Sequence, residues 1–127
     1  MIVLDTSILV DALTGPKRSA AALRGAIEGG ERLAVPALVL YEWLRGPRVT
    51  QELEAQEALF PSEAALAFGP QEAGMASRLY TSVPRPRGRK LDLAIAAHAL
   101  VSEARLWTLN ESDFADLPGL ELVAVER

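Results

Sequence analysis

Short apolar runs alternate with longer helical segments along the chain, and this alternation constrains the fold more than any other feature. Strands are expected at the apolar runs, which lie at residues 2–4, 33–35, 64–68, 106–109 and 122–125. Strands that are separated by helices, without hairpin turn signals, are typical of a parallel sheet with helices on both faces. We therefore expect an α/β fold with three α/β/α layers and a central parallel sheet of four to five strands.

Helical spacing of apolar residues places the helices between these strands. One expected helix stops at Gly29-Gly30, since glycine readily takes the positive φ found at helix ends, and Pro36 suits the first turn of the next helix. The expected helices cover residues 7–13, 19–27, 36–45, 49–59, 71–82 and 91–103. The 127 residues contain no repeat, low-complexity tract or long linker, so one domain is expected over 1–127.

Composition narrows the class of protein. The chain has no cysteine, which excludes disulfides and thiolate metal ligands. Its apolar runs are too short to cross a bilayer and do not form a signal peptide, so a cytoplasmic protein without membrane contact is expected. The formal net charge of −4 argues against a protein that coats nucleic acid by bulk charge. It does not exclude an enzyme that cuts nucleic acid, because acids around a metal ion are neutralised by that ion.

Acidic side chains recur at positions that a parallel sheet would bring together. Asp5 directly follows the first strand, and Asp113 comes just after the strand at 106–109. Ligands of such sheets bind beyond the carboxyl ends of the strands. Glu42 is embedded in an apolar helix, where an unpaired charge is costly, and Asp92 begins another helix. All four positions can therefore converge at one edge of the sheet.

Each of these acids also has an explanation that involves no function. Asp5 and Asp92 suit the beginnings of helices, and Asp113 suits a polar turn. Glu42 can point outward and pair with a nearby arginine. The case for a site depends on all four acids together.

A cluster of carboxylates suits one kind of chemistry in particular. Hard cations such as Mg²⁺ prefer oxygen ligands and bind through a few carboxylates, waters and substrate phosphates. Such ions activate water and stabilise the leaving oxygen when a phosphodiester is displaced in line. This chemistry needs neither cysteine nor histidine, and the chain contains a single histidine.

Four ordered blocks of the sequence carry these acids. The blocks are Ile2-Val-Leu-Asp5-Thr-Ser-Ile-Leu-Val10, Val35-Pro-Ala-Leu-Val-Leu-Tyr-Glu42-Trp-Leu-Arg-Gly46, Asp92-Leu-Ala-Ile-Ala-Ala-His-Ala-Leu100 and Leu106-Trp-Thr-Leu-Asn110-Glu-Ser-Asp113-Phe114. Together they resemble the PIN-domain ribonucleases, specifically the toxin subunits of bacterial toxin–antitoxin pairs (the VapC type). The blocks span the chain in the order and at the spacing of that family, and the stretch from Leu117 fits its last strand.

The resemblance implies a set of roles. It implies a PIN-like doubly wound sheet and a ribonuclease that depends on Mg²⁺ or Mn²⁺. It also implies an RNA substrate, a small antitoxin partner and a homodimer. The implied metal-binding and catalytic acids are Asp5, Glu42, Asp92 and Asp113. The implied supporting residues are Thr6, Ser7, Thr108 and Asn110.

Two positions depart from the family pattern. Ser7 stands where relatives often have asparagine, and Asn110 stands where many have an acid. The residue that completes the site therefore stays open between Asp113 and Asn110, with Asp113 placed first and Glu111 third.

Other functions remain as alternatives. A non-catalytic module of the same fold would act through protein contacts, although four intact acids count against it. A phosphatase with Asp5 as nucleophile would need a second aspartate where Ser7 stands, and a receiver domain would need adjacent acids near its start.

A basic segment leads directly into Asp92. Most charge runs are solvated loops, but cations near the mouth of the site would contact RNA phosphates. The candidate substrate-binding residues are Arg85, Arg87, Arg89 and Lys90.

Helical geometry separates other polar residues from the site. His98 follows Asp92 by six residues, or about 240° around a helix, so it is expected to face away. The same arithmetic places Asp11 away from Asp5. Trp43 and Trp107 lie in apolar runs and are expected in the core.

Overall fold

The computed structural model describes residues 1–124, and in this range three strands alternate with six α-helices and two short 3-10 helices. The elements are β1 (Ile2–Leu4), α1 (Thr6–Leu13), α2 (Ala20–Glu28), β2 (Leu33–Ala34), α3 (Ala37–Arg45), α4 (Thr50–Leu59), η1 (Ser62–Ala64), α5 (Pro70–Ser82), α6 (Lys90–Val101), β3 (Arg105–Trp107) and η2 (Glu111–Asp113). Every predicted helix is present. The largest difference is at α6, which was expected to end at 103 and ends at Val101.

The end of α6 has a local cause. Glu103 takes the left-handed backbone conformation, with φ of 53°. The amide of Ala104 then returns to the carbonyl of Ala99 at 2.8 Å and satisfies an orphan carbonyl of the last turn.

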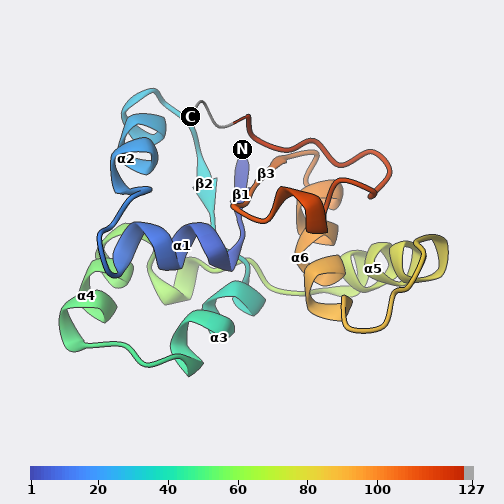
Figure 1. Ribbon diagram of the computed structural model, residues 1–127, viewed down its shortest axis with the longest axis horizontal. Coiled ribbons are helices and arrows are strands. Elements are labelled where there is room, and N and C mark those ends of the chain that lie inside the picture. The colour runs from blue at the N-terminus through green and yellow to red at the C-terminus, as the bar shows by residue number, and fades with distance from the viewer. Residues whose placement is uncertain (125–127) are drawn as a thin grey trace.

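The sheet is parallel with the strand order β2-β1-β3, so β1 is central. Residues of β1 pair with both neighbours, for example Ile2 with Leu33 on one side and with Arg105 on the other. Helices α1, α2 and α4 lie on one side of the strands and α5 and α6 on the other (Figure 1). This arrangement confirms the predicted α/β/α fold class.

The described sheet has three strands instead of the predicted four to five. The predicted strand at 64–68 contributes one parallel bridge, between Leu66 and Pro36. Pairing stops there because α3 begins at Ala37, immediately after this bridge. The predicted strand at 122–125 likewise contributes one bridge, between Leu122 and Leu106, and its last residue lies outside the described range.

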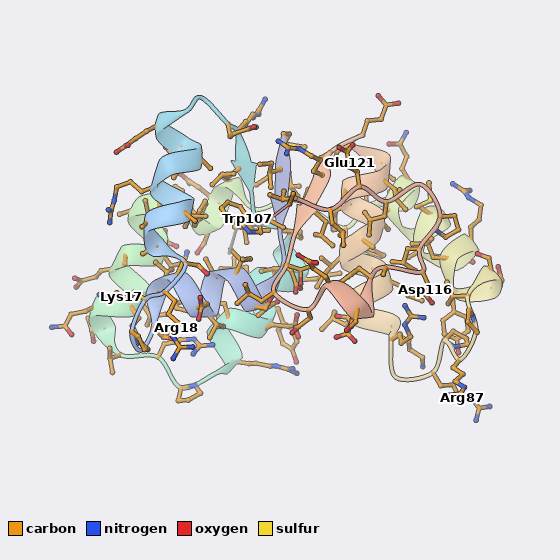
Figure 2. All side chains as sticks on the ribbon, turned by 45° about the horizontal axis from the view of Figure 1, so that its top comes forward. Lys17, Arg18, Arg87, Trp107, Asp116 and Glu121 are labelled. Atoms are coloured by element: carbon orange, nitrogen blue, oxygen red, sulfur yellow. The ribbon has the colours of Figure 1, made fainter. Side chains whose placement is uncertain are left out.

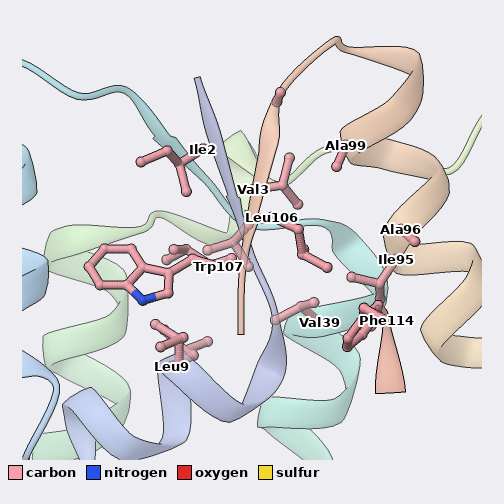
Figure 3. Close-up of a cluster of buried hydrophobic side chains, with 14 of the residues drawn as sticks. Ile2, Val3, Leu9, Val39, Ile95, Ala96, Ala99, Leu106, Trp107 and Phe114 are labelled. Carbon is pink, nitrogen blue, oxygen red and sulfur yellow. The ribbon is translucent and has the colours of Figure 1, made fainter. Parts of the chain in front are cut away.

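Apolar side chains from both layers meet around the sheet. Val3 of β1, Leu106 of β3 and Ile95 of α6 are fully buried and lie in one cluster (Figure 3). Trp43 and Trp107 are buried as well, as the sequence predicts. No helix within residues 1–124 is both long and apolar enough to span a bilayer.

His98 is also buried, in agreement with a packing role. It is 2% exposed, and its ring meets the edge of Phe68 with 5.8 Å between the ring centroids. Burial lowers the pKa of His98, which favours the neutral imidazole.

Candidate active site

Asp5 lies where β1 ends and α1 begins, at the carboxyl edge of the sheet. Its amide donates to the carbonyl of Trp107 at 2.9 Å, which joins the ends of β1 and β3. The side chain is 4% exposed but makes no capping bond to α1. Its Oδ2 instead accepts hydrogen bonds from Ser7 Oγ at 2.9 Å and from Thr108 Oγ1 at 2.7 Å. Helix capping therefore does not explain this carboxylate.

The two hydroxyl groups that hold Asp5 also tie the segment after β3 to α1. Ser7 Oγ accepts a hydrogen bond from the amide of Leu109 at 3.0 Å. Thr108 Oγ1 accepts one from the amide of Asn110, also at 3.0 Å. Because each hydroxyl accepts from the backbone, its proton is free to point at the Asp5 carboxylate.

Glu42 approaches the same edge from α3. Its Oε1 accepts a hydrogen bond of 2.6 Å from Thr6 Oγ1, at the start of α1. Its Oε2 lies 3.7 Å from Nη2 of Arg45, an ion pair whose arginine side chain is 58% exposed. So exposed a pair stabilises little. The predicted outward pairing with arginine thus exists, but the other oxygen of Glu42 contacts the hydroxyl beside Asp5.

Asp92 lies in the first turn of α6, and its surroundings disfavour its charged form. Its pKa is raised to about 6, first by burial and next by the charge of Asp5. The charges of Asp113 and Glu42 raise this pKa further, whereas Arg89 lowers it. The four predicted acids are therefore close enough to interact electrostatically, and they leave an excess of negative charge that a bound cation would relieve.

A pocket of about 500 Å³ opens between these elements. Three of the four predicted acids line it, together with supporting residues and Asn110: the lining includes Asp5, Thr6, Ser7, Glu42, Asp92 and Asn110. Asp113 lies in η2, is exposed and is not among the lining residues. The geometry thus brings Asn110 nearer to the pocket, while the charge of Asp113 still acts on Asp92.

Asp11 also lines this pocket, against the expectation that it faces elsewhere. The error has a physical reason. Asp5 precedes the helix in an extended conformation, with φ of −79° and ψ of 159°, so counting 100° per residue from it is not valid. The carboxylate of Asp11 accepts a hydrogen bond of 2.5 Å from Ser19 Oγ.

The donor set suits a hard divalent cation. All polar side chains named at the pocket offer carboxylate, hydroxyl or amide oxygens, which Mg²⁺ and Mn²⁺ prefer. As the side chains stand, however, no three His, Asp or Glu residues within 1–124 are close enough to hold an ion together. Without a cation, like charges repel, so ligation requires these carboxylates to draw closer.

The basic segment before α6 does not act as a unit. Arg89 donates to both carboxylate oxygens of Asp116, at 2.9 and 2.7 Å, and to the carbonyl of Asp113 at 2.9 Å. Arg87, in contrast, points away from the molecule (Figure 2). Arg85 and Lys90 are exposed. Arg89 is thus engaged within the protein, and the other three side chains are open to solvent.

Comparison of the sequence with family models identifies the family of this chain. Residues 2–120 match the family model of the PIN domain, and the chain belongs to this family.

Particular relatives agree with this assignment. The chain is 36% identical over 124 residues to the protein named ribonuclease VapC19 of Mycobacterium tuberculosis, which covers 95% of this chain and 98% of that one. Two solved structures share the fold with TM-scores of 0.73. One is VapBC2 of Rickettsia felis, 21% identical over 99% of this chain and 100% of that chain. The other is a toxin–antitoxin complex from Klebsiella pneumoniae, 24% identical over 94% of this chain and 95% of that chain.

Proposed function

We propose that this protein is a metal-dependent endoribonuclease that hydrolyses RNA phosphodiester bonds. The observation that carries the proposal is the pocket at the carboxyl edge of the sheet, which Asp5, Glu42 and Asp92 line and in which the pKa of Asp92 is raised to about 6. Membership of the PIN domain family and the 36% identical ribonuclease VapC19 support RNA as the substrate.

In this proposal Asp5, Glu42, Asp92 and Asp113 hold Mg²⁺ or Mn²⁺. When bound, such an ion supplies an activated water and neutralises the charge that develops on the phosphodiester. The hydroxyl groups of Ser7 and Thr108 hold Oδ2 of Asp5, and that of Thr6 holds Oε1 of Glu42. These bonds keep the acidic side chains in fixed rotamers, so less freedom is lost when an ion and a substrate bind.

The same proposal includes a protein partner and a substrate path. The solved structures that share this fold include a toxin–antitoxin complex, so we expect a small antitoxin to bind this chain and inhibit it. Phosphates of the RNA would contact Arg85, Arg87 and Lys90, because these cations are exposed near the beginning of α6. Arg89 and Asn110 are assigned to support of the acids.

RNA cleavage is expected only when Mg²⁺ or Mn²⁺ is present. The carboxylates alone repel a phosphodiester and cannot activate water, so EDTA should abolish cleavage and added metal should restore it. A panel of labelled single-stranded and structured RNAs, incubated with purified protein, measures this directly. Cleavage that persists unchanged in EDTA would contradict the proposed mechanism.

A further inference from the structure

Arg89 joins two segments that carry different acids of the proposed site. It is the residue before α6, three positions ahead of Asp92. Its guanidinium donates one hydrogen bond to each carboxylate oxygen of Asp116 and a third to the carbonyl of Asp113. The sequence separation is 27 residues from Asp116 and 24 from Asp113. We call these three hydrogen bonds the Arg89 clamp.

The clamp is a well-defined interaction. The Arg89 side chain is 20% exposed and that of Asp116 is 42% exposed, with a closest N–O distance of 2.7 Å. A paired guanidinium and carboxylate with two bonds has a fixed relative orientation, which a single ion pair lacks. The pairing raises the pKa of Arg89 and lowers that of Asp116, so both groups stay charged.

The clamp acts on the segment that contains Asp113. Phe114 and Leu117 anchor this segment in the core, with 1% and 4% exposure. Between β3 and these anchors, the 3-10 turn η2 is closed by two backbone hydrogen bonds of 3.0 Å, from the amide of Asp113 to the carbonyl of Asn110 and from that of Phe114 to the carbonyl of Glu111. The third bond of the clamp holds the Asp113 carbonyl, and thereby the backbone from which its side chain projects.

We propose that Arg89 is a positioning residue that, through Asp116, sets Asp113 against Asp92 and so allows Asp113 to complete the metal site. This inference rests on the proposed function, since it concerns the same site. In this inference Arg89 holds neighbouring protein segments together and does not bind RNA phosphate. It also gives a way in which Asp113, which does not line the pocket, could act as a metal ligand.

The test compares two variants that break the clamp in opposite electrostatic senses. Arg89→Gln removes a positive charge and Asp116→Asn removes a negative one, yet both break the paired bonds. Each is expected to weaken Mn²⁺ binding about tenfold in calorimetric titration, as loss of a partner that orients metal ligands does. Each should also speed amide hydrogen exchange at Asp113 and Phe114. Arg78→Gln and Glu121→Gln remove the same charges from exposed sites and should change neither readout.

Two results would overturn the inference. If Asp116→Asn weakens Mn²⁺ binding and Arg89→Gln does not weaken it, the two residues act through their charges and not as a clamp, because loss of a nearby cation favours a bound metal ion and loss of an anion disfavours it. If neither variant changes exchange at Asp113, the clamp does not hold this segment. Failure of the wild-type protein to bind Mn²⁺ would count against the proposed function, and the exchange rates would still decide whether the clamp exists.

Discussion

The variant Asp92→Asn is expected to be more stable than the wild-type protein in the absence of metal, while it loses RNA cleavage. Asparagine has nearly the same shape but carries no charge. It therefore removes the cost of burying a carboxylate beside three other acids, which raises the pKa of Asp92 to about 6. It also removes a proposed metal ligand.

The size and pH range of the stabilisation follow from this pKa. The pKa of an aspartate in an unfolded chain is about 3.8, so Asp92 holds its proton more tightly in the folded protein. The stability that protonated Asp92 contributes is present below pH 3.8 and is lost as the pH rises through about 6. The full shift corresponds to about 3 kcal/mol. Solvent screening of this half-buried group reduces it to about 1–2 kcal/mol.

Thermal unfolding in EDTA at several pH values measures this effect. The variant should unfold a few degrees above the wild type at pH 8, and the difference should vanish near pH 4. Added Mn²⁺ should stabilise the wild type more than the variant, because a ligand stabilises only the state that binds it. If Asp92→Asn were less stable than the wild type at pH 8 in EDTA, the proposed cost of burying the charged Asp92 side chain would be contradicted.

Replacing Asp5 by asparagine should reduce RNA cleavage by at least about 10²-fold, comparable to the loss of one transition-state-stabilising group in other enzymes. The fold should survive. The carbonyl oxygen of asparagine can accept the hydrogen bonds of Ser7 and Thr108, since both donors are hydroxyl groups that rotate. The lost charge belongs to a carboxylate that lines the acidic pocket, so metal affinity and rate should fall together.

An acidic residue at the opposite edge of the sheet, where the strands begin, provides the control. Glu31 precedes β2 and pairs with Arg105 of β3, at the amino ends of these strands. Glu31→Gln removes the same charge and should leave cleavage within about twofold of the wild type, because an exposed pair of this kind contributes little. Equal losses in both variants would show that net charge, and not the site, governs cleavage.

Much of the fold follows from local sequence signals. Gly29-Gly30 and Pro36 mark a helix end and a helix start that the structure confirms, and the alternation of apolar runs predicts the parallel sheet. The edge strands were overpredicted because their apolar character does not reveal where backbone pairing stops. Pro36 marks the start of α3 in the sequence, but nothing local shows that the segment at 64–68 pairs with Pro36 alone, because that pairing depends on tertiary geometry.

For the site, too, the sequence predicts some features and not others. Asp5 could be located because a carboxylate directly after a buried parallel strand must lie at the carboxyl edge of the sheet. Asp11 was excluded by a helical count that began one residue before the helix. The pairing of Arg89 with Asp116 could not be predicted, since 27 residues separate them and charged residues nearer in sequence offered other partners.

The central claim is that these acids form one divalent-metal site, and calorimetric titration of Mn²⁺ into the metal-free protein tests it most directly. Mn²⁺ is expected to bind saturably to the wild type, at least tenfold more weakly to Asp5→Asn and Asp92→Asn, and with unchanged affinity to Glu31→Gln. Wild-type affinity in both site variants, or no binding at Mn²⁺ concentrations that support RNA cleavage, would contradict it.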